Sequence, residues 1–284
     1  MRASADDTPD PLDIGALRAQ LDVATLPRLA GVEIVDRIDS TNSELLRRRT
    51  PARGLAALFA EAQDGGRGRH GRIWQSPPGS NLYLSVARCF DGDLSTLSGL
   101  SIAAGIAAAE AMHALGVCEA RVKWPNDLVV VDGGALRKLG GVLVEGGVQD
   151  GRARAVVGIG LNVRMPDDAA ARIDQPWTDL HRLVGDALPT RNRVAAAVLD
   201  ALASTLETFA RDGLRGMIAR FDALDALHGR AISAIDAAAG NGDAVHGIAD
   251  GLCDDGAMRV RTDDGPRTLR AGEVRVRLDA AAQA

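Results

Sequence analysis

Residues 65–83 read GGRGRHGRIWQSPPGSNLY, and this stretch narrows the choice of fold and chemistry. Its first eight positions hold four glycines and three arginines. Glycines let backbone N–H groups approach a ligand closely, and guanidinium groups grip phosphate oxygens in pairs. The stretch therefore predicts a clamp for an anionic ligand. A solvated surface loop is the alternative interpretation, because runs of charged residues usually face water.

The same glycines also match a weaker pattern. Gly66, Gly68 and Gly71 satisfy the G-x-G-x-x-G spacing of dinucleotide-binding folds, which requires a helix to begin at the glycines. The chain continues instead into Gln-Ser-Pro-Pro-Gly at 75–79, which cannot be helical. We therefore reject a dinucleotide-binding fold.

Length and composition limit the class of protein. A chain of 284 residues predicts one large domain plus a small one. The net charge of -5 disfavours a protein that coats nucleic acid, and three scattered cysteines predict neither a disulfide framework nor a zinc site. The acidic start lacks the apolar run of a signal peptide, and the apolar segment 100–117 carries Glu110 and His113. We therefore expect a cytoplasmic protein with a buried helix in that segment and no membrane partner.

The N-terminal half alternates helix and strand signals. The first eleven residues look disordered, and residues 12–22 can form a short helix. Thr41 and Glu44 have capping-box spacing, which predicts a helix from Thr41 to about Arg49. Period-2 alternation at 81–88 predicts a half-buried strand. The segment 55–62 is ambiguous between helix and strand. A strand at 32–36 and a long helix at about 97–115 are also expected.

The C-terminal half ends in β structure. Strands are expected at Arg-Val-Lys-Trp, at 138–145 and at 153–163, with Asp132-Gly133-Gly134 as the turn between the first two. A mobile polar loop is expected at 164–176, followed by helices at 178–184, 190–212 and 214–224. Short β segments at 229–278 indicate a small terminal barrel. The expected fold class is therefore α+β with a terminal β module.

Lysine is rare in this chain. The 33 basic residues include only two lysines, Lys123 and Lys138. A lysine ammonium is a compact point charge that a guanidinium replaces poorly. Lys123 stands in Lys-Trp-Pro-Asn-Asp at a strand end, where a rigid scaffold meets a loop and ligands are often held.

Five motifs in order resemble the biotin protein ligases. They are D-S-T-N at 39–42, G-R-G-R-x-G-R-x-W-x-S-P-x-G-x-N-L-Y at 66–83, K-W-P-N-D-L at 123–128, K-L-x-G-x-L-x-E at 138–145 and G-I-G-L-N-V at 158–163. The resemblance implies a mixed β-sheet catalytic domain flanked by helices, of the class II synthetase-like biotin/lipoate ligase fold, and a C-terminal SH3-like β-barrel. It divides the chain into an N-terminal extension (1–30), a biotin- and ATP-binding domain (31–226) and an SH3-like domain (227–284).

The resemblance also implies a two-step acyl transfer. ATP, with Mg²⁺ on its phosphates and no metal held by protein ligands alone, activates biotin to biotinyl-5′-AMP. A lysine of a biotin carboxyl carrier protein domain then receives the biotin. The glycine-rich stretch and the loop 164–176 are the expected lids, because the mixed anhydride must be kept from water. The implied state is a monomer or a homodimer.

The resemblance assigns roles to individual residues. The catalytic residues are Lys123 and Arg69. The residues implied for biotin are Ser40, Thr41, Asn42, Gln63, Gly66, Arg67, Gly68, Arg69, Lys123 and Gly141. The residues implied for the nucleotide are Arg69, Arg72, Trp74, Asn126, Asn162 and Trp177.

Structural alternatives stand beside several of these assignments. Thr41 can simply cap its helix, and Trp74 and Trp177 can be core aromatics. Lys138 can be a solvated turn residue. Asn126, with the neighbouring Asp127, can serve only to fix the turn that aims Lys123.

Three other functions compete with biotin ligation. Some relatives are also DNA-binding repressors, but only about 30 residues precede the first strand, too few for a helix-turn-helix domain. Lipoate ligases share the architecture but lack the combination of GRGRxGRxW and KWPND. A non-catalytic biotin-binding module would bind biotin without releasing pyrophosphate from ATP.

Overall fold

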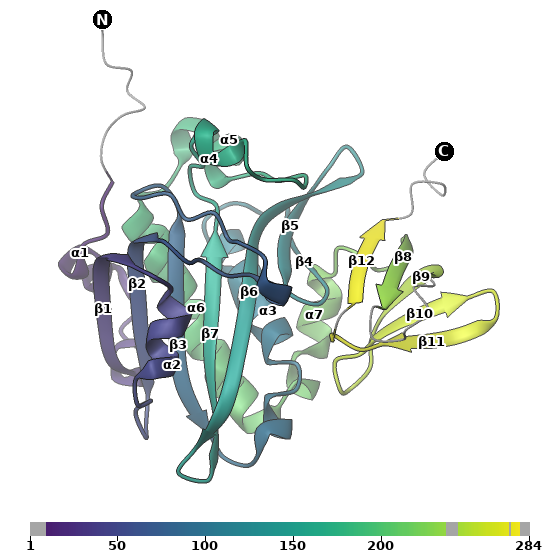
Figure 1. Ribbon diagram of the computed structural model, residues 1–284, viewed down its shortest axis with the longest axis horizontal. Helices are drawn as coiled ribbons and strands as arrows, with labels where there is room; N and C mark the ends of the chain where they lie inside the picture. The colour runs from purple at the N-terminus through teal and green to yellow at the C-terminus, as the bar shows by residue number, and fades with distance from the viewer. Residues whose placement is uncertain (1–9, 237–243, 273, 279–284) are drawn as a thin grey trace, which may run out of the picture.

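The main body of the protein is a seven-stranded mixed sheet (Figure 1). The computed structural model describes residues 10–236, 244–272 and 274–278. The strand order is β1-β2-β3-β7-β6-β5-β4, and β1 and β2 pair in parallel whereas the other pairs are antiparallel. The strands are β1 (Leu29–Ile38), β2 (Leu55–Gln63), β3 (Leu82–Phe90), β4 (Ala120–Lys123), β5 (Asp127–Asp132), β6 (Ala135–Gln149) and β7 (Arg152–Leu161). The ambiguous segment 55–62 is therefore a strand.

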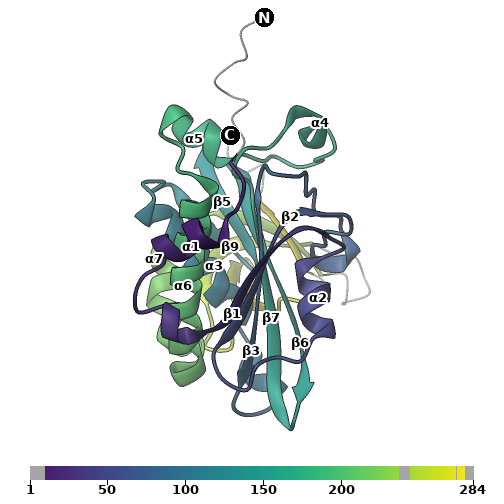
Figure 2. The ribbon, with the colours of Figure 1, turned by 90° about the vertical axis from the view of Figure 1, so that its left-hand side faces the viewer.

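Helices cover the sheet unequally (Figure 2). One face carries four helices, two of them long, and the other carries the short α2 (Thr41–Arg47). The helices of the first face are α1 (Ile14–Gln20), α3 (Leu100–Ala114), α6 (Arg191–Asp212) and α7 (Ile218–Leu224). The helices predicted at 12–22, 190–212 and 214–224 are thus present, whereas the predicted disorder of the first eleven residues falls mainly outside the described residues.

The central helix α3 is buried, as predicted. Eleven of its fifteen residues are buried, many of them alanines, and these small side chains let it pack closely against α6 and the sheet. By length and composition alone the segment Leu94–Ala114 could cross a membrane. In the fold most of that segment is instead part of the core.

Strand β3 differs from its predicted half-buried pattern. Leu82, Leu84 and Val86 point into the main core, but Tyr83 and Ser85 on the opposite face are also buried. The reason is that α2 covers this second face, where a small apolar cluster forms from Leu45, Leu58, Ala87 and Val156. The prediction that one face of this strand is solvated was therefore wrong, because the short helix α2 covers that face.

The prediction also missed strand β5. The turn at Asp132-Gly133-Gly134 joins β5 to β6, not β4 to β6. Gly133 and Gly134 both have positive φ, 56° and 84°, as a two-residue hairpin turn requires. Residues 164–176 contain one helical turn, α4 (Asp167–Ala170), and α5 (Leu180–Val184) follows.

The C-terminal residues form a second, five-stranded antiparallel sheet of order β11-β10-β9-β8-β12. Its strands are β8 (Ala231–Asp236), β9 (Ala244–Leu252), β10 (Met258–Thr262), β11 (Gly265–Leu269) and β12 (Val274–Leu278). The expected domain boundary at 226/227 falls in the connection between α7 and β8. In that connection the Ala226 N–H donates to the Val122 carbonyl (2.9 Å), which ties the second sheet to β4.

Candidate active site

A cavity of about 640 Å³ lies between the large sheet, the glycine-rich loop and β12. Most of the predicted ligand residues line it: Ser40, Thr41, Asn42, Gln63, Arg67, Gly68, Arg69, Arg72, Trp74, Lys123, Asn126 and Gly141. These residues come from five separate segments of the chain. The fold therefore gathers the motifs that the sequence holds far apart.

One end of the cavity is polar and buried. Ser40, not Thr41, is the N-cap of α2, since its hydroxyl accepts from the Ser43 N–H at 3.4 Å. The Thr41 side chain is thereby released from capping and lies 3.2 Å from Oε1 of Gln63, which also accepts from the Thr41 N–H at 2.9 Å. The capping interpretation of Thr41 was wrong by one residue. As a result, the buried Thr41 and the half-buried Gln63 form a hydrogen-bonded pair at the cavity wall.

Asn42 completes this polar end. Its Oδ1 lies 2.6 Å from the hydroxyl of Ser85, and its Nδ2 donates to the Leu143 carbonyl (3.2 Å) and to Glu145 (2.9 Å). A Cβ on Gly158 would lie 2.3 Å from Asn42 Oδ1, so only glycine leaves room for this amide. Ser85, which the sequence analysis missed, is fully buried and also lies 2.7 Å from Thr41 Oγ1.

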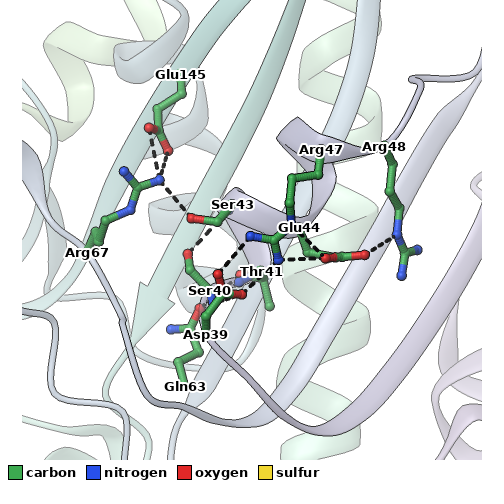
Figure 3. Close-up of polar contacts among 10 residues, drawn as sticks. All are labelled: Asp39, Ser40, Thr41, Ser43, Glu44, Arg47, Arg48, Gln63, Arg67 and Glu145. Atoms are coloured by element: carbon green, nitrogen blue, oxygen red, sulfur yellow. Dashed lines mark hydrogen bonds and ion pairs between the residues drawn. The ribbon is translucent and has the colours of Figure 1, made fainter.

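An ion-pair network supports α2 from its outer side (Figure 3). Arg47 pairs with Asp39 (2.8 Å) and Glu44 (2.7 Å), and Arg48 pairs with Glu44 (2.7 Å). The hydrogen bond from Arg47 lowers the pKa of Asp39 to about 2. The carboxylate that precedes the cap therefore stays ionised at neutral pH and keeps the start of the helix in place.

The three arginines of the loop differ in their surroundings. Arg67 pairs with Glu145 (3.0 Å), whereas Arg72 is exposed at the rim of the cavity. Arg69 donates to Asn126 Oδ1 (3.3 Å) and to the carbonyl oxygens of two residues before β12, Ala271 and Gly272. Burial lowers the pKa of Arg69. The loop thus lines the cavity with all three arginines although many of its residues are exposed, and the anion clamp stays a prediction.

Trp74 lies flat against two glycines of the sheet. A Cβ on Gly160 would lie 2.4 Å from its ring, and one on Gly141 would lie 3.6 Å away. The Lys138 ammonium stands 5.4 Å from the ring centroid, a cation–π contact. The buried indole N–H has no hydrogen-bond partner within the described part of the chain. Trp74 is therefore a wall of the cavity rather than a core aromatic.

Both lysines line the cavity. Lys138 Nζ pairs with Asp127 Oδ1 at 2.6 Å, and only 17% of its side chain is exposed, so the solvated-turn interpretation is wrong. Burial lowers the pKa of Lys123, Asp127 opposes this shift, and Lys138 and Arg277 add to it. The charge of Lys123 is thus partly desolvated and closely surrounded by other cations, which favours binding of an anion.

The second sheet contributes to the cavity. Val276, Arg277 and Leu278 of β12 line it, none of which the sequence analysis had assigned. Trp124, beside Lys123, is 1% exposed and donates its indole N–H to the Gly256 carbonyl at 2.9 Å. Val276, Arg277 and Leu278 are held in place by the pairing of β12 with β8, which lies about forty residues earlier in the chain. No local pattern in the sequence predicts this pairing.

Three predicted ligand residues do not line the cavity. Gly66 is buried at the base of the loop, where its carbonyl accepts from the Trp74 N–H at 2.9 Å. The Asn162 amide donates to the Thr178 carbonyl at 3.0 Å. The Trp177 ring lies 4.0 Å from the Arg182 guanidinium, and the predicted lid just before it contributes Asp174, Gln175 and Pro176 to the lining.

Solved structures share this fold. A biotin protein ligase from Aquifex aeolicus, solved in complex with biotin and ATP, superposes with a TM-score of 0.72 at 23% identity and covers 88% of this chain and 100% of its own. A biotin protein ligase from Leishmania major in complex with biotin gives a TM-score of 0.53 at 24% identity, with 85% of this chain and 98% of that chain covered. The expected α+β ligase fold is confirmed.

Sequence comparisons agree with the fold. A model of the "Biotin/lipoate A/B protein ligase family" matches residues 34–162. The bifunctional ligase/repressor BirA of Salmonella typhimurium is 37% identical over 268 residues, which cover 94% of this chain and 78% of that relative. The biotin–[acetyl-CoA-carboxylase] ligase of Paracoccus denitrificans is 33% identical over 244 residues, with 84% and 97% covered. The chain belongs to the biotin/lipoate A/B protein ligase family.

Proposed function

We propose that this protein is an ATP-dependent biotin protein ligase that transfers biotin to a lysine of a biotin carboxyl carrier protein domain. One observation carries the proposal: a single cavity joins a polar end at Thr41, Gln63 and Ser85 to a cationic end at Lys123 and Lys138. Biotin has a polar ureido ring at one end and a carboxylate at the other. The two ends of the cavity match the two ends of that molecule.

In the first step a biotin carboxylate oxygen attacks the α-phosphorus of ATP, and the bond to pyrophosphate breaks. Two anionic groups must approach each other, so positive charge has to be concentrated where they meet. Lys123, Lys138 and Arg69 supply it, and Asp127 holds Lys138 in place. Mg²⁺ enters as part of the MgATP substrate.

In the second step the amine of the acceptor lysine attacks the activated carbonyl, and the bond to AMP breaks. AMP leaves with the electron pair, and the amine loses a proton. The lysine ammonium groups stabilise the oxygen that carries the developing negative charge. Arg69 and residues 174–176 keep water away from the mixed anhydride until the acceptor arrives.

Nucleotide roles for Trp74, Arg72 and Asn126 remain part of the proposal. The Trp74 ring at the cavity wall offers a flat surface to a base, and Arg72 at the rim offers a fork to phosphate oxygens. For Asn162 and Trp177 the proposed role is to hold the segment that carries the lid, since neither lines the cavity. The division at 1–30, 31–226 and 227–284 gives the last unit the task of completing the site through β12.

Lipoate is the alternative substrate within the family. Its dithiolane ring has no N–H or carbonyl group, so it can exchange no hydrogen bond with Thr41, Gln63 or Ser85. A site built to hydrogen-bond its ligand rejects an analogue that lacks those groups. The polar end of the cavity therefore favours biotin.

Transfer of labelled biotin to a carboxyl carrier domain in the presence of MgATP tests the proposal. We expect labelled carrier, release of pyrophosphate, and binding of biotin but not lipoate in a calorimetric titration. Binding of biotin without release of pyrophosphate would show instead that the protein is a non-catalytic biotin-binding module. We further propose that the enzyme acts in the cytoplasm as a monomer or homodimer and without nucleic acid, which sedimentation and a gel-shift assay would test.

A further inference from the structure

Glu145 lies on β6 just outside the cavity, yet it touches two residues that line it, Arg67 and Asn42. Figure 3 shows its contact with Arg67. One carboxylate oxygen, Oε2, accepts from Arg67 Nη2 at 3.0 Å and from Asn42 Nδ2 at 2.9 Å. Arg67 belongs to the glycine-rich loop and Asn42 to the first turn of α2. A single carboxylate therefore joins the loop to the polar end of the cavity.

The contact holds Arg67 by one nitrogen. Nη2 donates to both Glu145 oxygens and also to the Ser43 hydroxyl, the latter at 3.1 Å. The Nε and Nη1 groups of Arg67 have no partner among residues 10–236, 244–272 and 274–278. Arg67 lines the cavity, so these remaining donors are available to a ligand while the guanidinium is fixed from behind.

The second contact fixes the direction of the Asn42 amide. With Nδ2 held by Glu145 and by the Leu143 carbonyl, Oδ1 is left to face Ser85 at 2.6 Å. Ser85 in turn lies 2.7 Å from Thr41 Oγ1. The polar wall that contacts the ligand is thus aligned through a chain of hydrogen bonds that begins at Glu145.

We infer that Glu145 is a positioning residue that preorganises Arg67 and Asn42 for the polar ring of the ligand. The inference rests on the proposed function, in which that ring is the ureido group of biotin. Preorganised donors bind more tightly because no rotamer freedom is lost when the ligand arrives. Removing the negative charge frees Arg67 to leave the cavity and weakens capture of biotin without touching the phosphate end.

The test compares Glu145→Gln with Glu33→Gln, a matched control. Glu33 also pairs with an arginine, Arg48 at 2.9 Å, but neither residue lines the cavity. Glutamine at 145 keeps an acceptor for Asn42 and loses the charge that holds Arg67. We expect the biotin Kd to rise about five- to tenfold in Glu145→Gln, the effect of one charge-assisted hydrogen bond, with the KM for ATP unchanged. Glu33→Gln should bind biotin like the wild type.

A double-mutant cycle with Arg67→Ala separates positioning from a general loss of structure. In the Arg67→Ala background, Glu145→Gln should change the biotin Kd less than about twofold, because the residue it positions is gone. An unchanged Kd in the single variant, or equal effects in both backgrounds, would overturn the inference. If the wild-type protein does not bind biotin at all, the proposed function fails and the inference falls with it.

Discussion

The indole N–H of Trp124 donates to the carbonyl of Gly256 across 2.9 Å, and this bond joins the two sheets directly beside Lys123. Trp124 is 1% exposed, and its neighbour in the chain lines the cavity. The Trp124 side chain thereby reaches the turn between β9 and β10 and fixes the backbone that carries Lys123. Packing between the sheets and the geometry of the site are linked.

Trp124→Phe should therefore destabilise the protein and impair catalysis together. The variant leaves the Gly256 carbonyl without its donor and leaves a small void, which costs about 2 kcal/mol of unfolding free energy. Urea denaturation measures the loss. Trp177→Phe serves as the control, because phenylalanine keeps a ring for Arg182 and the ring is only partly buried. Equal losses in the two variants would contradict the role given to Trp124.

Lys123→Ala and Lys138→Ala should each slow formation of biotinyl-AMP by about 100-fold or more, the usual effect of deleting a charge-stabilising donor. Pyrophosphate release at saturating substrate measures the rate. Arg137→Ala is the matched control, since Arg137 precedes Lys138 but forms an exposed pair with Asp132. A Lys123→Ala enzyme of nearly full activity would remove that lysine from the mechanism.

Arg69→Ala should release the adenylate faster while leaving stability almost unchanged. Burial lowers the pKa of Arg69 and disfavours its charged form, which offsets the hydrogen bonds that it donates to Asn126, Ala271 and Gly272. Its loss should therefore cost the folded state little. The dissociation rate of biotinyl-AMP should rise about tenfold or more, because the closing guanidinium is gone. A melting temperature that collapsed while biotin affinity stayed the same would show that Arg69 serves the fold instead.

Gly158→Ala should abolish biotin binding at micromolar concentrations. The added Cβ would lie 2.3 Å from Asn42 Oδ1 and would push the amide out of the polar wall. Gly147→Ala on the neighbouring strand is the control, because a Cβ there meets nothing within 4 Å. Calorimetric titration with biotin compares the two, and normal affinity in Gly158→Ala would contradict the arrangement described.

Asp225 gives the stability a pH dependence of known sign. Burial raises its pKa to about 6, against the weaker opposing effects of the Leu227 N–H and His228, while Asp222 adds to the rise. Because the folded pKa exceeds the unfolded value of 3.8, the unfolding free energy falls as the pH rises from about 4 to 6, by up to about 3 kcal/mol. Asp225→Asn should melt higher than the wild type at pH 7 and equally at pH 4. The same difference in melting temperature between the variant and the wild type at both pH values would contradict the prediction.

Local patterns predicted much of this molecule. The apolar run of α3 and the periodicity of α6 identify both helices, and the glycine and arginine spacing at 65–72 marks a loop that lines the cavity. Local sequence patterns failed to identify the N-cap of α2, because two adjacent residues can both fill that position. Ser40 and Thr41 are both acceptable N-caps, and only the fold, which needs Thr41 at Gln63, decides between them.

Long-range contacts explain the remaining misses. Lys138 looks like a turn residue in sequence, and its burial depends on Asp127 across β5 and on Trp74 from the loop. Arg277 reaches the cavity only because the second sheet docks beside β4. No window of ten residues contains both partners of any of these contacts.

Lys138 also pairs through its backbone with the segment that follows the lid. Its N–H donates to the Pro176 carbonyl and its carbonyl accepts from the Thr178 N–H, both at 2.9 Å. In the proposed function the segment over the product and the cation beneath it would consequently share one anchor. A substitution that loosened this segment to speed product release would then also displace Lys138.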